Sequence, residues 1–221
     1  MRVANHRLVA AGSRFRVARA DSPNAGETMA PRLIVVHFTA GTTAEGAVAW
    51  LRDPASQVSA HLVVARSDGA VTQLVSFDRV AWHAGRSEWN GETDVNRFSI
   101  GIELDNAGRL ERRDGAWRNY AGAVIPDDEV VVATHRNERV EAGWHRFSDA
   151  QLAALVEAVA AIRAAYPIEA IVGHDEIAPG RKADPGPAFP MAALRDGTLA
   201  PAPPSVGLLR RLFARLRRSQ R

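Results

Sequence analysis

The sequence contains no cysteine and only one lysine. The absence of cysteine excludes disulfide bonds, thiolate zinc sites and cysteine nucleophiles, so any metal site must be built from histidines and carboxylates. It does not indicate a compartment, because a chain without cysteine suits reducing and oxidising surroundings alike. The single lysine, Lys182, stands among 27 arginines. A lysine is a compact point charge that can reach one developing oxyanion, whereas an arginine presents a planar fork.

Long apolar segments are also missing. Residues 1–20 carry charges every few positions and contain no uninterrupted apolar stretch, so a signal peptide is not expected. No run of about 18 apolar residues occurs, and no transmembrane helix is predicted. We therefore expect the chain to be cytoplasmic as synthesised.

Basic residues are concentrated at one end of the chain. The formal net charge is +3, but residues 208–221 contain six arginines and no acidic residue. The preceding residues 1–207 carry 22 basic and 25 acidic side chains. A basic surface suited to nucleic acid is therefore not expected on the body of the protein.

The domain organisation follows from length and composition. With 221 residues, 46% of them hydrophobic and 24% charged, the chain is typical of one soluble domain with a full core. We place an N-terminal extension at 1–30, the main domain at 31–196, a Pro-rich linker at 197–207 and an Arg-rich amphipathic tail at 208–221. The tail suits an anionic surface such as a bilayer, and it suits plain disorder equally well.

Short apolar runs interleaved with two long helical segments predict an α/β fold with a central mixed β-sheet flanked by helices. The helices are predicted from two capping boxes, Thr42 with Glu45 and Ser148 with Gln151, and each ends at a proline. We interpret the charged segment 107–147 as an extended loop or hairpin. Strands are predicted at 14–18, 33–36, 60–65, 71–75, 99–104 and 168–172.

Two histidines directly follow apolar runs that we predict as buried strands, His37 after LIVV and His174 after AIVG. Ligand sites of α/β sheets gather just beyond strand ends, but either histidine taken singly is more typical of a hydrogen-bonded core residue. The loop VGHDEIAPGRKADPGPAF adds Asp184 and is shaped by six glycines and prolines. A surface loop with solvated side chains is the plainer interpretation of this stretch. Two histidines and one carboxylate are, however, a standard ligand set for a catalytic zinc ion with a bound water.

Glu103 is the only ionisable residue of the predicted strand SIGIEL. If the strand is buried, the carboxyl group must find a partner or have a raised pKa, and both suit a general base. The alternative is an edge-strand glutamate that points into water. In the first case, Glu103 would take a proton from a zinc-bound water, and Lys182 with zinc would stabilise the oxyanion formed when the hydroxide attacks a carbonyl. Such a set hydrolyses an amide.

Four motifs occur in order between about residues 31 and 192: VVHFTAG, AWHAG, SIGIELDN and GHDEIAPGRKADPGPAF. Together they resemble the zinc-dependent N-acetylmuramoyl-L-alanine amidases of the type 2 group. That group includes muropeptide-recycling amidases, phage lysis amidases and, more distantly, peptidoglycan recognition proteins. The resemblance implies a mixed sheet with helices packed on it and one Zn²⁺ in a surface groove.

The resemblance also implies an activity and a set of site residues. The expected reaction is cleavage of the amide bond between N-acetylmuramic acid and L-alanine in peptidoglycan or muropeptides. His83 of AWHAG would line the substrate groove, although a histidine that ties a loop explains this position as well. The implied zinc ligands are His37, His174 and Asp184, the catalytic acid/base is Glu103 and the transition-state cation is Lys182.

Two other functions share this pattern. A non-catalytic peptidoglycan-binding module would lack a zinc ligand, and the presence of all three favours the enzyme. A zinc hydrolase of another amide would differ only in its groove. We expect a monomer whose partner is peptidoglycan or a muropeptide. A recycling enzyme would act in the cytosol, whereas a lytic enzyme would reach the cell wall after holin-type release, and the basic tail favours an anionic envelope surface.

Overall fold

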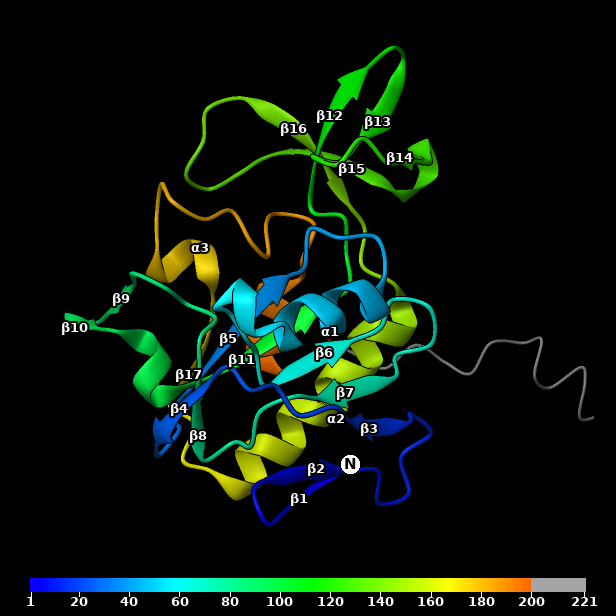
Figure 1. Ribbon diagram of the computed structural model, residues 1–221. Coiled ribbons are helices and arrows are strands. Elements are labelled where there is room, and N and C mark those ends of the chain that lie inside the picture. Colours follow the sequence, from blue (N-terminus) through cyan, green and yellow to red (C-terminus); the bar gives the residue numbers. More distant parts are fainter. Residues whose placement is uncertain (200–221) are drawn as a thin grey trace, which may run out of the picture.

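The computed structural model describes residues 1–199, and a six-stranded sheet forms its centre (Figure 1). Four neighbouring strands are parallel, the fifth is antiparallel to the fourth, and the edge strand is parallel to the fifth. The sheet is therefore mixed, and the predicted α/β fold is confirmed. The strand order is β17 (Ala170–Gly173), β5 (Leu33–Phe38), β11 (Ser99–Leu104), β6 (Leu62–Val64), β7 (Val71–Gln73) and β3 (Val17–Arg19).

Helices cover both faces of this sheet, which explains why its parallel strands are apolar. α2 (Asp149–Ala165) packs on one face, where its Leu155 belongs to the same core cluster as Ile34. α1 (Ala44–Arg52) covers part of the other face through Leu51. Polar side chains on the sheet face that α1 covers are therefore expected near the strand ends, where α1 leaves this face uncovered.

The helix starts differ in detail from the prediction. The N-cap of α1 is Thr43 and not Thr42, because Thr43 Oγ1 accepts a hydrogen bond from the Gly46 N–H at 3.1 Å. Ser148 caps α2 as predicted and accepts a hydrogen bond from the Gln151 N–H at 3.2 Å. The Gln151 side chain does not complete the capping box. It donates instead to the backbone carbonyls of strand β6 and of the segment after β11.

Residues 107–147 form a second sheet, so the prediction of an extended loop or hairpin was wrong. All neighbouring strands are antiparallel, and the sheet projects from the body of the protein (Figure 1). The strands are short, and in β12 only Leu110 is buried, so charged residues hide any alternating pattern there. The order is β14 (Val124–Ile125), β13 (Ala116–Arg118), β12 (Arg109–Arg113), β16 (Glu141–His145) and β15 (Val130–Thr134).

The first 30 residues contribute short strands that pack on the main sheet. The predicted edge strand lies slightly further along the chain than expected, because β3 occupies Val17–Arg19. The predicted hairpin of β6 and β7 is confirmed by their antiparallel pairing. The remaining elements are β1 (Arg2–Ala4), β2 (Arg7–Val9), β4 (Ala25–Thr28), β8 (Arg79–Ala81), β9 (Glu88–Trp89), β10 (Glu92–Thr93), α3 (His174–Ile177), α4 (Met191–Asp196) and 3-10 turns at Pro54–Ser56, Val95–Phe98 and Asp127–Glu129.

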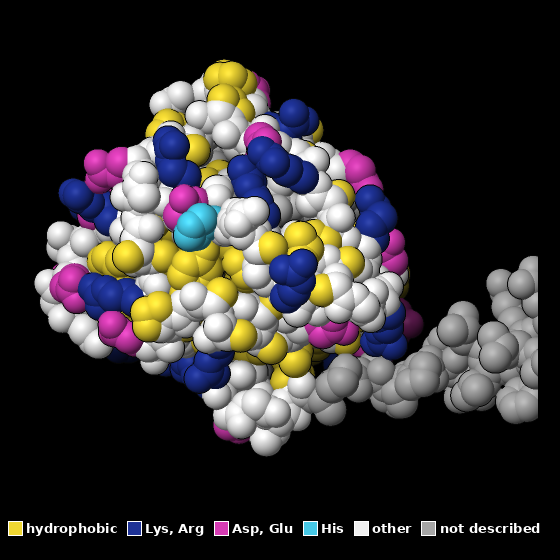
Figure 2. Space-filling model, turned by 90° about the horizontal axis from the view of Figure 1, so that it is seen from below, with side chains coloured by type: hydrophobic (Ala, Val, Ile, Leu, Met, Phe, Trp, Pro, Cys, Tyr) yellow, Lys and Arg dark blue, Asp and Glu magenta, His cyan; other side chains and the backbone are white. Residues whose placement is uncertain are grey.

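The predicted tail at 208–221 and most of the predicted linker at 197–207 lie outside the described residues. No helix within residues 1–199 has the length and hydropathy needed to span a bilayer. On the face beside β1 and β2, Lys and Arg side chains are interspersed with Asp and Glu (Figure 2). This face therefore lacks the continuous basic surface that a nucleic acid would require.

Candidate active site

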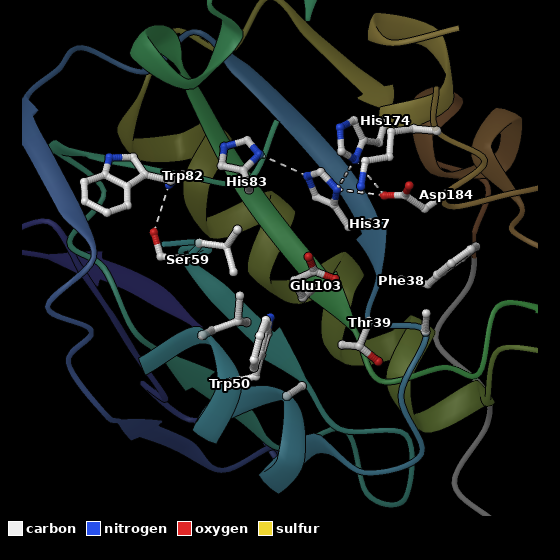
Figure 3. A pocket seen from close by; sticks show the side chains of 15 residues that line it. His37, Phe38, Thr39, Trp50, Ser59, Trp82, His83, Glu103, His174 and Asp184 are labelled. Atoms are coloured by element: carbon white, nitrogen blue, oxygen red, sulfur yellow. Dashed lines mark hydrogen bonds and ion pairs between the residues drawn. The ribbon is translucent and has the colours of Figure 1, made fainter. Parts of the chain in front are cut away.

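The ends of neighbouring parallel strands bring the predicted site residues together (Figure 3). In the register of β5 and β11, His37 lies opposite Glu103, and side chains at paired positions leave the sheet on the same face. Gly173, the last residue of β17, pairs with Val36, so His174 follows at the level of His37. The loop that begins there was predicted without a helix, but His174 opens the short helix α3.

Three potential ligand atoms converge on one point. The Nδ1 atoms of His37 and His174 are 2.9 Å apart, and Asp184 Oδ2 lies 2.8 Å from the first and 2.9 Å from the second. All three side chains are buried. This is a group that can hold a metal ion, and the geometry brings together residues that are up to 147 positions apart in the sequence.

The donor set fits a metal ion because its atoms present lone pairs to one another. His174 Nε2 lies 3.0 Å from the carbonyl oxygen of Ala84. The Nη2 group of Arg181, 3.3 Å from the same nitrogen, donates over shorter distances to the carbonyls of Ala84 and Arg86. Because a carbonyl only accepts, Nε2 carries the proton. In the neutral imidazole, Nδ1 is then a bare lone pair that faces Asp184 Oδ2. Such lone pairs repel at hydrogen-bond distance unless a cation lies between them.

Burial sets the protonation state of the same residues. Together with the neighbouring His174, burial lowers the pKa of His37 to about 4, although Asp184 opposes this. Burial would raise the pKa of Asp184, but the two imidazoles beside it hold that pKa below its usual range. Neutral His37 and ionised Asp184 are the forms in which these side chains bind a metal ion.

Glu103 lies inside the protein and not at a sheet edge, because β11 is paired on both sides by β5 and β6. Its Oε2 atom is buried and has no hydrogen-bond partner among the described residues. Burial and, after it, the charge of Asp184 raise the pKa of Glu103 to about 8, against the opposing effect of Lys182. The carboxyl group is thus poised to exchange a proton near neutral pH.

A cavity of about 280 Å³ joins these groups. Glu103 and Lys182 line it together with the three potential metal ligands, and so does His83. The structure therefore places every sequence-predicted site residue around one cavity. The loop bearing Lys182 is held by the Lys182 N–H, which donates to the Ala178 carbonyl at 3.0 Å.

Sequence analysis missed Trp50, whose ring lines the cavity although 59% of the residue is exposed. Together with Thr39 and Ala47 it also lines an adjoining hollow that extends to Asn119 and Tyr120 on the second sheet. No charged residue lines this hollow. The only available signal was that Trp50 falls on the exposed face of α1, and single exposed aromatic residues are common on protein surfaces.

Sequence analysis also assigned no role to His135. Its Nε2 atom lies 3.0 Å from Oδ2 of Asp175, and both residues are buried. The Asp175 N–H donates to the carbonyl oxygen of Asp184 at 2.8 Å. The second sheet thus contacts the loop that carries two of the potential metal ligands. No signal pointed to this pair, because its members are 40 positions apart.

Comparisons with known proteins agree with this geometry. A family model described as N-acetylmuramoyl-L-alanine amidase (Amidase_2) matches residues 27–187. The chain is 36% identical over 171 residues to the N-acetylmuramoyl-L-alanine amidase AmiD of Escherichia coli K12, which covers 74% of this chain and 51% of AmiD. The chain spans about half the length of the curated relatives it matches.

Solved structures show the same fold. A crystal structure of an AmpD derivative has a TM-score of 0.61 at 29% identity, and the match covers 90% of this chain and 99% of that chain. The complex of E. coli AmiD with the substrate anhydro-N-acetylmuramic acid-L-Ala-D-gamma-Glu-L-Lys has a TM-score of 0.56 at 33% identity, covering 79% of this chain and 58% of that chain.

Proposed function

The chain belongs to the N-acetylmuramoyl-L-alanine amidase family (Amidase_2), and from this membership we propose that it is a zinc-dependent hydrolase. Its proposed reaction is cleavage of the amide bond between N-acetylmuramic acid and L-alanine in peptidoglycan or muropeptides. The observation that carries the proposal is the convergence of His37, His174 and Asp184 beside the half-buried carboxyl group of Glu103 in one cavity. A module that only binds peptidoglycan has no use for a proton-exchanging Glu103 at this place.

In the proposed mechanism, each polar residue of the cavity has a separate task. His37, His174 and Asp184 would hold one Zn²⁺, which when bound polarises the scissile carbonyl and lowers the pKa of water. Glu103 accepts a proton from the attacking water and passes it to the nitrogen of the leaving L-alanine. The ammonium group of Lys182 stabilises the negative charge that develops on the carbonyl oxygen.

The pKa of Glu103 suits this double role. At about 8 in the absence of metal, it lies closer to neutrality than that of an ordinary carboxyl group, and a bound cation would lower it. A proton can therefore be taken up and released near the operating pH with little free-energy cost. Glu103 lines the cavity, so its carboxyl group can exchange a proton with the water and then with the leaving amine.

Support for the substrate comes from the relatives and from the shape of the site. The AmiD structure contains an anhydro-muramyl tripeptide, and we propose an anhydro-muropeptide of this kind as the first substrate to test. The uncharged hollow beside the cavity, bordered by Trp50 and Tyr120, suits the sugar side of the substrate, because aromatic rings pack on the apolar faces of sugars. A hydrolase of another amide would show no requirement for the sugar.

Mass spectrometry of digests provides the test. Purified sacculi and a soluble anhydro-muropeptide would be incubated with the zinc-loaded protein, the chelated protein and the Glu103→Gln variant. We expect free stem peptides that begin with L-alanine, formed only by the zinc-loaded wild type. Binding of muropeptide without cleavage would support the binding module instead. Cleavage of a peptide amide that lacks the muramyl group would support a different amidase.

The same experiment addresses the setting of the activity. A preference for the soluble muropeptide would indicate recycling, whereas a preference for sacculi would indicate lysis of the wall. The monomeric state, the compartment and the binding of the tail to an anionic envelope surface stay predictions. Size-exclusion chromatography with light scattering tests the first, and deletion of residues 205–221 with assays on both substrates tests the third.

A further inference from the structure

His83 uses both of its ring nitrogens inside the protein. Its Nδ1 atom lies 3.0 Å from Nε2 of His37, on the side of that ring away from the potential metal ligand atom (Figure 3). Its Nε2 atom lies 3.2 Å from Oγ of Ser99. The Ser99 hydroxyl group donates in turn to the carbonyl oxygen of Val95 at 2.7 Å. Four residues thus form a chain of hydrogen bonds that ends at the metal centre.

The Val95 carbonyl, at the end of this series of hydrogen bonds, fixes which atom donates in each of them. A carbonyl oxygen only accepts, so the single hydroxyl proton of Ser99 is engaged with Val95 and the Ser99 oxygen must accept from His83 Nε2–H. Neutral His83 then presents a lone pair at Nδ1, which must accept from His37 Nε2–H. His37 is left with its lone pair at Nδ1, the atom that faces His174 and Asp184.

On the basis of the metal centre proposed above, we propose that His83 and Ser99 are positioning residues that select the metal-binding tautomer and ring orientation of His37. Without them, the carboxylate of Asp184, 2.8 Å from His37 Nδ1, would favour a proton on that atom and so block the metal. The chain of hydrogen bonds opposes this by giving His37 Nε2–H an acceptor, His83 Nδ1, at 3.0 Å. Partners on the remote nitrogen of a ligating histidine commonly act in this way.

A glycine allows His83 to reach this position. A Cβ atom at Gly101 in β11 would lie 2.4 Å from Cγ of the His83 ring and 2.7 Å from its Nδ1. Any other residue at 101 would therefore displace the ring from His37. The glycine in SIGIEL, which the sequence alone left unexplained, leaves space for the imidazole between the loop and the strand.

The segment that carries His83 also holds the second histidine ligand. The carbonyl oxygen of Ala84 accepts the hydrogen bond from His174 Nε2. The side chain of Asn96 fixes this segment, because its Oδ1 accepts from the backbone N–H groups of His83 at 3.1 Å and of Ala84 at 2.8 Å. Two consecutive residues thus orient both imidazoles of the metal centre from the side opposite the metal.

This arrangement gives His83 a role different from the predicted lining of the substrate groove. Its ring borders the cavity, but neither nitrogen is left to bind a substrate. A contact with substrate predicts that substitution raises KM and leaves metal binding intact. A positioning role predicts that metal binding weakens first.

The first measurement is zinc affinity by chelator competition on the full chain. We expect His83→Ala to weaken zinc binding about 10–100-fold, the usual effect of removing such a partner, and Ser99→Ala to weaken it by a smaller factor. His83→Asn should recover part of the loss, because its amide oxygen can accept from His37. Ser87→Ala is the matched control, since its hydroxyl group bonds within the same loop, to Gly85, outside the chain of hydrogen bonds. Unchanged zinc affinity in folded His83→Ala would overturn the proposal.

The second measurement is the tautomer of His83 in the zinc-loaded wild type, by two-bond ¹H–¹⁵N NMR. We expect the proton on Nε2 and a bare Nδ1, and we expect Ser99→Ala to shift His83 toward the other tautomer. A proton on Nδ1 of His83 in the wild type would reverse the chain and contradict the proposal. This test uses the wild-type spectrum, so it does not depend on whether a variant folds.

These readouts separate the positioning role from the proposed amidase reaction. If zinc binds and His83 controls its affinity, but no muramyl amide is cut, the proposed substrate is wrong and the positioning role holds. If the wild type binds no zinc, the proposed metal centre fails. The tautomer of His83 in the metal-free protein then decides between the two directions of the hydrogen bonds.

Discussion

The two main sheets of this protein use similar strand lengths for different purposes. In the central sheet, β5 and β11 are buried almost throughout, and the exceptions are Phe38 and Glu103 near their carboxyl ends. In the second sheet, formed by residues 109–145, most residues of β12 and β15 are exposed or half-buried, whereas β16 is buried except for Glu141. The central sheet carries Glu103, His37 and the strand that leads to His174. The second sheet contributes no potential metal ligand, and His135, Arg136 and Asn137, which follow β15, contact the loop that begins at His174.

The difference between the two sheets indicates which positions of this fold suit catalytic and metal-binding side chains. Polar side chains at the ends of buried strands are held by fixed neighbours, and their desolvation shifts pKa values and favours metal binding. Polar side chains on an exposed sheet remain solvated and contribute little. Substitutions should therefore have effects that fall with distance from the carboxyl ends of the central strands.

The largest effect is expected from a ligand of the proposed metal centre. His174→Ala should abolish stoichiometric zinc binding and lower turnover by about 10³-fold or more, because the metal supplies several kcal/mol of transition-state stabilisation. Equilibrium dialysis and the muropeptide assay measure both. His145→Ala, in the second sheet, removes a histidine bonded to Glu129 and should retain zinc. Full zinc binding by His174→Ala would contradict the assignment.

A similar loss of turnover without loss of metal is expected at Glu103. Glu103→Gln keeps the shape of the side chain but cannot transfer a proton, so turnover should fall about 10²–10⁴-fold. Zinc affinity should stay within a few-fold of the wild type. The result that contradicts this role is turnover near that of the wild type in a zinc-loaded Glu103→Gln protein.

The pH dependence of stability gives a separate test of Glu103 in the metal-free protein. Its pKa is raised from 4.5 to about 8 on folding, so its contribution to stability is fully present below pH 4.5 and is lost as the pH rises toward 8. Glu103→Gln lacks this loss. Its free energy of unfolding relative to the wild type should grow by on the order of 4 kcal/mol between pH 4 and 8.

Urea unfolding of the chelated proteins at several pH values measures this change. A difference between Glu103→Gln and wild type that does not vary with pH would show that the carboxyl group has an ordinary pKa in the folded state.

A smaller effect is expected where the two sheets meet. His135→Ala leaves buried Asp175 without its partner, and Asp175 holds the Asp184 carbonyl through its backbone N–H. We expect zinc affinity to fall about 10-fold, as for other residues that orient ligands indirectly. Arg113→Ala is the control, because Arg113 forms a pair with Glu111 within the second sheet, both side chains are more than half exposed, and such pairs contribute little. Equal losses in both variants would mean that the second sheet does not position the loop.

The smallest effect is expected on the exposed face of the second sheet. Val132 is 54% exposed, so Val132→Ala should change the free energy of unfolding by less than about 0.5 kcal/mol. Val35→Ala, the same substitution in the buried part of β5, should cost about 2 kcal/mol because it leaves a cavity. Chemical unfolding of both variants makes the comparison directly, and similar costs would show that the two sheets are equally buried.

Much of the fold was predictable from local signals. Continuous apolar runs identified β5 and β11, a turn sequence identified the hairpin of β6 and β7, and Ser148 identified the start of α2. The second sheet was not predictable as a whole, because its one continuous apolar run, in β15, indicates a single strand, and β12 and β16 have charged or mixed sequences. The start of α1 was misplaced by one residue, because adjacent threonines at 42 and 43 offer the same capping oxygen and only the backbone conformation selects one.

The sequence by itself determined which side chains were available for chemistry. Without cysteine, the candidate ligands were histidines and carboxylates, and the motifs singled out His37, His174, Asp184, Glu103 and Lys182. It also determined the face of β11 on which Glu103 lies, because side-chain direction alternates along a strand.

The tertiary structure decided how these side chains are held. Only the parallel register sets Glu103 beside His37, and only the folded loop brings His83 and Ala84 behind the two imidazoles. Hydrogen-bond direction depends on partners far apart in the chain, and a linear sequence does not specify which distant groups meet. The tautomer of a histidine, and with it the atom offered to a metal, is therefore a property of the fold.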